Sequence, residues 1–229
     1  MRIRSFIIAY ALVLAILLFA DRRHEPLSPN RYSHVVDLTG QPADTARNVP
    51  LHSAPTKPSR ISEQSRTLIV APDTLIPGTW TAGQIPAERL IAPLVVMDLD
   101  VSPASASQIS LDDIAAWESQ HGTIPQGAIV AIRHSVADHA AASALPPITA
   151  DAAQFLMDAR YTTGFAIETQ PDFSSDRTLA RQIALHGNYV VEGTTRLATL
   201  PATGSLIIVA PEKNKSTGRT PVRVLAMVK

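Results

Sequence analysis

Short apolar segments alternate with helix-like segments along the chain after Arg66, and this alternation constrains the fold more than any other feature. The apolar segments have three to seven residues and are rich in β-branched side chains, which is typical of buried strands. The expected strands are residues 67–71, 94–99, 127–133, 165–167, 189–192, 206–209 and 222–228. The alternation predicts an α/β protein with layers around one core, but it does not give the order or the direction of the strands.

Three helices are expected between these strands, and each has its own start or stop signal. Ser110, with an acidic residue three positions later, can cap the first helix, and Gly122 ends it. Thr149 begins the second helix, in which the apolar residues keep helical spacing. The third helix is expected at about residues 176–185 and stops at Gly187.

The composition fits one globular domain without a strong charge. The chain has 229 residues, 45% of them apolar, and its formal net charge is zero from 20 basic and 20 acidic residues. This balance gives no support for a nucleic-acid partner. The basic residues Lys213, Lys215 and Arg219 are interpreted as a solvated turn rather than a phosphate site. The absence of cysteine excludes disulfides, thiolate metal ligands, a cysteine nucleophile and a lipid-modified cysteine.

Residues 1–24 form a segment of a different kind, either a signal peptide or a membrane anchor. Arg2 and Arg4 precede an apolar run of 16 residues at 5–20, which spans roughly 24 Å as a helix, against a hydrocarbon core of about 30 Å. This length favours the apolar region of a signal peptide. The arginines at 22–23 and an imperfect cleavage site favour a retained anchor instead, and both interpretations remain open. We expect export to the periplasm or extracellular space, or a membrane-anchored domain facing outside the cytoplasm.

Residues 25–66 are rich in Pro, Ser, Thr and charge, with a single apolar alternation at residues 35–38. This composition predicts a linker, a first strand and a long loop. Residues 67–229 then contain the remainder of the domain.

Six ordered blocks of sequence carry a resemblance to a known family. They are Val-Val-Asp-Leu-Thr at 35–39, Ile-Pro-Ala-Glu-Arg-Leu at 85–90, Pro-Leu-Val-Val-Met-Asp-Leu at 93–99, Ile-Pro-Gln-Gly-Ala-Ile-Val at 124–130, Ala-Ala-Gln-Phe-Leu at 152–156 and the long block Glu192 to Pro211. Together they resemble the cyclase family of metal-dependent hydrolases, which includes kynurenine formamidase and isatin hydrolase. The resemblance covers residues 33–228. It implies a single α/β cyclase-like domain with a mixed β-sheet and flanking helices, an arylformamidase-type amide hydrolase as the family activity, and the possibility of a homo-oligomer.

Active members of this family carry the motif His-x-Gly-Thr-His-x-Asp-x-Pro-x-His, with a later histidine and a glutamate, and hold one or two divalent cations, typically zinc or manganese. With Thr67 and Pro72 aligned on the motif, the functional positions here are Gln64, Leu68, Val70, Thr74, Ala180 and Glu192. Only Glu192 keeps the family residue. A divalent ion needs about four N, O or S donors, so the resemblance implies that the metal site is lost. Leu68 and Val70 lie on the same side of a strand and would fill the former site with apolar side chains.

Other polar residues leave two catalytic alternatives open. His134, Asp138 and His139 could act as relocated ligands with Asp73 and Glu192, although the spacing defines no geometry and surface histidines are the simpler interpretation. Asp73 and Glu192 are also weak candidates for a general acid and base pair. Against this, Asp73 begins a turn after a proline, which is a common structural use of aspartate.

Four of the five remaining histidines have structural explanations. His121 and His186 are expected at the ends of helices, where a cation interacts well with the helix dipole, and His34 and His52 are expected to be solvated. No Gly-x-Ser-x-Gly sequence supports a serine mechanism.

Three functional classes remain. The first is a catalytically silent family member, exported or tethered to the membrane, with no metal and a closed former site. The second is an arylformamidase-type hydrolase with relocated ligands for zinc or manganese. The third is a metal-free protein that binds an unknown small-molecule ligand. Fold alone does not decide between them, because function depends on the site.

Overall fold

The computed structural model describes residues 32–40, 67–99, 108–134, 148–168, 177–213 and 218–229. Ser33–Lys229 form one compact unit. The apolar segment expected to be a signal or an anchor lies outside the described residues. Within the described ones, no helix is both long enough and apolar enough to cross a membrane.

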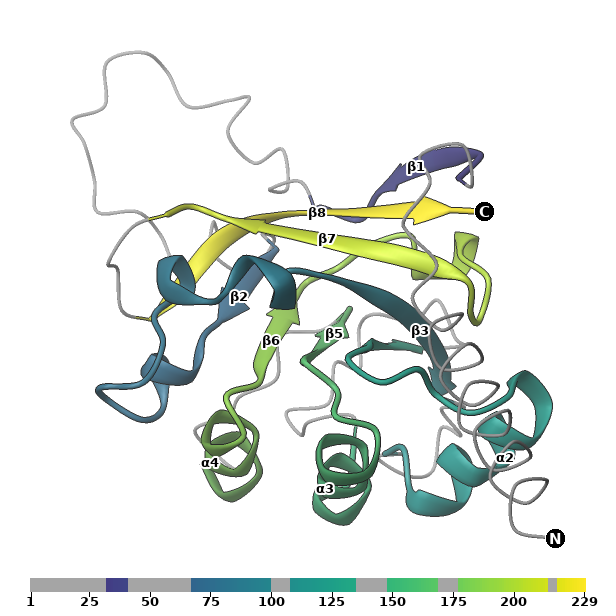
Figure 1. Ribbon diagram of the computed structural model, residues 1–229, viewed down its shortest axis with the longest axis horizontal. Helices are drawn as coiled ribbons and strands as arrows, with labels where there is room; N and C mark the ends of the chain where they lie inside the picture. Colours follow the sequence, from purple (N-terminus) through teal and green to yellow (C-terminus); the bar gives the residue numbers. More distant parts are fainter. Residues whose placement is uncertain (1–31, 41–66, 100–107, 135–147, 169–176, 214–217) are drawn as a thin grey trace, which may run out of the picture. The chain divides into compact units, whose positions relative to one another are not determined.

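Every strand and helix expected from the sequence is present (Figure 1). The strands are β1 (His34–Asp37), β2 (Leu68–Val70), β3 (Ile91–Leu99), β4 (Ile129–His134), β5 (Gly164–Ile167), β6 (Tyr189–Glu192), β7 (Ser205–Pro211) and β8 (Arg219–Val228). The helices are α2 (Leu111–His121), α3 (Ala150–Ala159) and α4 (Arg177–Leu185). This confirms the mixed α/β class.

The strands close into a seven-stranded barrel, which the sequence did not predict. The order is β8-β2-β6-β5-β4-β3-β7, and β7 pairs back with β8, while β1 adds to β8 outside this ring. Strands β3 to β6 run parallel to one another, whereas β2, β7 and β8 pair antiparallel with their neighbours. Closure depends on β8, because one of its sides pairs with β7 and the other pairs first with β2 and then with β1.

Side chains alternate between two buried layers along each barrel strand. One layer fills the barrel and includes Leu94, Ile129 and Tyr189. The other layer lies between the strands and the helices and includes Val70 and Val190. Figure 1 shows α4, α3 and α2 in a row beside the parallel strands. We refer to the surface of the strands that faces this second layer as the helix-facing side.

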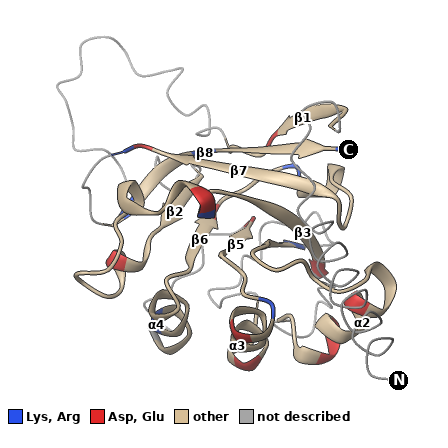
Figure 2. Cartoon of the chain, in the orientation of Figure 1, with Lys and Arg blue, Asp and Glu red and all other residues tan. Residues whose placement is uncertain are grey.

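The predicted helix signals hold, with one difference. Ser110 and Asp113 form a reciprocal capping box at the start of α2, and Gly122 follows its end with φ of 86°. Thr149 is at the N-cap position of α3, but its hydroxyl donates to Asp151 at 2.6 Å instead of accepting a backbone N–H. Figure 2 shows acidic residues on α2 and α3 and basic residues on α4 and on strands and loops of the described part.

Two strands begin three residues earlier than predicted, because a proline does not end either of them. β3 continues through Pro93, whose missing N–H is tolerated because pairing with β4 starts only at Leu94. β8 begins at Arg219 instead of Val222 and passes through Pro221. The early start of β8 places Arg219 in the sheet.

Candidate functional site

Four of the positions that the resemblance assigns to the metal site are buried on or against the helix-facing side of β2 and β6. Leu68 pairs directly with Glu192, and Val70 pairs with Val190. Leu68 is 7% exposed, Val70 4% and Glu192 0%. Ala180 of α4 belongs to the same apolar cluster as Val70. The structure therefore brings these positions together, but with three apolar side chains and one carboxylate.

The Glu192 carboxylate is held by an arginine. Its Oε1 accepts a hydrogen bond from Nη2 of Arg219 at 3.1 Å, and its Oε2 has no hydrogen-bond partner within the described part of the chain. Burial raises the pKa of Glu192 to about 7, and the nearby Arg219 guanidinium opposes this rise. A carboxylic acid in such an environment changes charge close to neutral pH.

The interpretation of Arg219 as part of a solvated turn is wrong. Its side chain is 41% exposed, but it starts β8 and its guanidinium pairs with a fully buried carboxylate. A sequence signal was available, since Arg219 and Arg223 stand four residues apart, on the side of a strand opposite to Val222 and Val224. Lys213 is exposed, in line with the prediction, and Lys215 lies outside the described residues.

The structure says less about the other two former ligand positions, Gln64 and Thr74. Gln64 lies outside the described residues. Thr74 lies in a short 3-10 helix, Pro72–Thr74, and its buried hydroxyl has no partner among the residues that the structure describes. Thr67 is structural, because its hydroxyl donates to the carbonyl of Gly193 at 2.8 Å and accepts from the N–H of Gly40 at 2.6 Å.

Asp73 stabilises a turn, which is the structural use that the sequence suggested. Its Oδ1 accepts from the N–H of Gly78 at 2.9 Å, and its own N–H donates to the carbonyl of Trp80 at 3.1 Å. Among the described hydrogen bonds, none joins Asp73 to Glu192. The geometry thus gives no support to an acid and base pair of these two residues.

The structure describes only some of the residues considered as relocated metal ligands. His134 is the last residue of β4, and Asp138 and His139 lie outside the described residues. In the described ranges, no group of three or more His, Cys, Asp or Glu could hold a metal ion. The side chains now at Leu68, Val70 and Ala180 offer a divalent ion no lone pairs, so they do not fit the cation of the family.

The helix-end histidines behave largely as expected. His121 is the last residue of α2. His186 follows α4 by one residue, and its ring bonds the Gln182 carbonyl at 2.8 Å and Asp158 at 2.9 Å. His34, in β1, is exposed.

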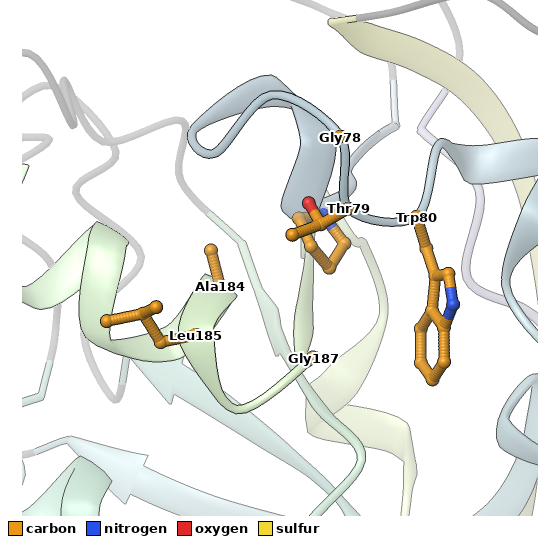
Figure 3. Close-up of a pocket in the computed structure, with 7 residues that line it drawn as sticks. Gly78, Thr79, Trp80, Ala184, Leu185 and Gly187 are labelled. Carbon is orange, nitrogen blue, oxygen red and sulfur yellow. The ribbon is translucent and has the colours of Figure 1, made fainter.

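A pocket of about 210 Å³ lies beside the C-terminal end of α4 (Figure 3). It is lined by Pro72, Gly78, Thr79, Trp80, Ala184, Leu185 and Gly187. The Trp80 ring packs beneath the guanidinium of Arg89 at 5.5 Å. None of the former ligand positions lines this pocket, so it is a hollow separate from Glu192.

The chain belongs to the family described as "Putative cyclase", whose model matches residues 26–171. It is 28% identical to isatin hydrolase of Roseibium aggregatum, with 73% of each chain covered. The fold is similar to isatin hydrolase A from Labrenzia aggregata bound to benzyl benzoate, with a TM-score of 0.64, 26% identity and coverage of 88% of this chain and 96% of the other. It is also similar to a potential metal-dependent hydrolase with cyclase activity, with a TM-score of 0.57, 23% identity and coverage of 86% and 98%.

Proposed function

We propose that this protein is a catalytically silent member of the cyclase family that acts as a binding or scaffold module, exported or tethered through its N-terminal segment. One observation carries this proposal. At the former ligand positions, Leu68 and Val70 are buried beside Glu192, whose carboxylate is already paired with Arg219.

The chemistry of the family depends on a divalent ion that lowers the pKa of bound water and polarises a carbonyl. Aliphatic side chains cannot bind such an ion, and Glu192 alone is one donor of the four or so required. Glu192 is also fully buried, so a substrate cannot reach it without rearrangement. The arrangement supports a packed site in place of a reactive one.

The test is a metal and activity assay on the purified full chain. After dialysis we expect less than stoichiometric zinc and manganese, and no hydrolysis of isatin or of an N-formyl aromatic amine above the uncatalysed rate. An isatin hydrolase in the same assay serves as the positive control. Stoichiometric metal that is lost on Glu192→Gln, or measurable turnover, would refute the proposal.

A second candidate is a hydrolase with relocated ligands. The observation in its favour is that His134 ends β4 and Glu192 ends β6, and both strands are parallel, so both residues lie at the same edge of the sheet. The strands are separated by β5, which corresponds to roughly 10 Å. Bound metal that is lost on His134→Ala but kept on the matched change His121→Ala would favour this candidate.

A further inference from the structure

The ion pair between Arg219 and Glu192 crosses an intervening strand. In the barrel, β2 lies between β8 and β6. Arg219 pairs with Val70 on one side of β2, and Glu192 pairs with Leu68 on the other. Directly paired residues point to the same face of a sheet, and so do residues i and i+2 of a strand. All four side chains therefore share the helix-facing side.

The distance between β8 and β6 fixes the path of the arginine. Two strand spacings amount to roughly 9.5 Å, yet Nη2 of Arg219 is 3.1 Å from Oε1 of Glu192. The two side chains must therefore meet over β2, and Arg219, the longer of them, extends toward Glu192 over the positions of Leu68 and Val70. Arginine suits this path because its methylene groups pack on apolar surface while its guanidinium keeps its charge.

We propose that the Arg219 guanidinium is the built-in cation of this site, supplying to Glu192 the positive charge that a divalent ion supplies in metal-dependent relatives. The inference rests on the proposed function, because a bound metal and this arginine would compete for the same carboxylate. It adds that Leu68, Val70 and Arg219 form one unit with Glu192. The aliphatic pair provides the apolar surface, and the arginine provides the charge.

The alternative is that Arg219 is an ordinary surface arginine that only happens to reach Glu192. The two ideas differ in how strongly the contribution of Arg219 to stability depends on the charge of Glu192. Exposed ion pairs contribute little to stability, whereas a buried carboxylate that loses its partner is strongly destabilising. Arg223 provides a matched control on the same strand, because it pairs at 3.1 Å with Asp37, whose side chain is 40% exposed, whereas Glu192 is fully buried.

The experiment is a double-mutant cycle read by thermal unfolding of the full chain above the pKa of Glu192. We expect Arg219→Met to lower Tm by roughly 5 °C, an effect reduced because Arg219 is partly exposed. In the Glu192→Gln background the same change should lower Tm by less than roughly 2 °C, because no buried charge is left unpaired. Arg219→Lys should lower Tm by less than half as much as Arg219→Met, since lysine retains the positive charge. Arg223→Met should have a small effect in both backgrounds.

Equal effects of Arg219→Met in the two backgrounds, or equal effects of Arg219→Met and Arg219→Lys, would overturn the inference. If Arg219→Met alone does not fold, recovery of folding in the double variant with Glu192→Gln gives the same support, and failure of the double variant overturns the idea. The proposed function is tested separately, because it fails if the unmodified chain retains stoichiometric metal.

Discussion

Restoring the family's residues on β2 should destabilise this domain and should not restore a metal site. The perturbation is the double change Leu68→His and Val70→Asp. Both positions are buried, at 7% and 4% exposure, and both belong to the strand that separates β8 from β6. If the site has become core, these polar groups enter a surface built for aliphatic contact.

The expected size follows from the two side chains that are lost. Burial of Leu or Val stabilises by about 1.5 to 3 kcal/mol each, so the pair accounts for about 3 to 6 kcal/mol. Burial of new polar groups adds a cost, although the position of Val70 faces Arg219 in the register and that of Leu68 faces Glu192, which offsets part of it. For a chain of this size, a loss of about 4 kcal/mol lowers Tm by about 10 °C.

The assay is thermal unfolding with and without zinc or manganese, and the matched control is Leu68→Ala with Val70→Ala. The control removes apolar contact without adding polar groups, so the polar variant should melt at or below it. Neither metal should raise the Tm of the polar variant. A polar variant that melts at the parent temperature, with metals raising it further, would refute the view that the site is packed.

Three further predictions concern other parts of the chain. Burial raises the pKa of Glu192 from 4.5 to about 7, so the folded protein holds this proton more tightly than the unfolded chain. The contribution of this proton to the free energy of unfolding is therefore complete below pH 4.5. It decreases by up to about 3 kcal/mol as the pH rises through 7. Glu192→Gln should remove this component of the Tm profile against pH, and a profile that does not change contradicts it. Gly164→Ala should lower stability by about 2 kcal/mol in denaturant unfolding, because its new Cβ would lie 2.7 Å from the carbonyl oxygen of Tyr189; an unchanged midpoint would show that β5 and β6 can separate. A reporter fused after Val228 should be active outside the cytoplasm, since Arg2 and Arg4 precede the apolar run; activity only in the cytoplasm would exclude that orientation.

The sequence predicted the elements well because their signals are local. The capping box at Ser110, the glycine after α2 and the apolar runs of the strands act within a few residues. Barrel closure could not be predicted in the same way, because it depends on pairing between β7 and β8 and on the two partners on the other side of β8. The partners on that other side of β8 are distant in sequence, as in the pairs Leu68 with Pro221 and Val36 with Ala226, and no local pattern encodes them.

The candidate site was predictable in its residues but not in its electrostatics. The resemblance singled out Leu68, Val70, Ala180 and Glu192, and the structure gathers them on or against one side of two strands. Arg219 was missed because its role depends on the register between β8 and β2. A one-residue shift in that register would turn its side chain to the opposite face.

This dependence on register links the closure of the barrel to the chemistry of the site. Glu192 is the last residue of β6 and is completely buried. Its negative charge therefore requires an oppositely charged partner, whichever strand carries that partner. The partner arrives on β8, the strand that also closes the barrel through β7. A change that weakens the start of β8 should therefore affect both the packing of the barrel and the charge balance at Glu192. The role of Arg219 in this ion pair is structural, and it does not depend on any catalytic activity.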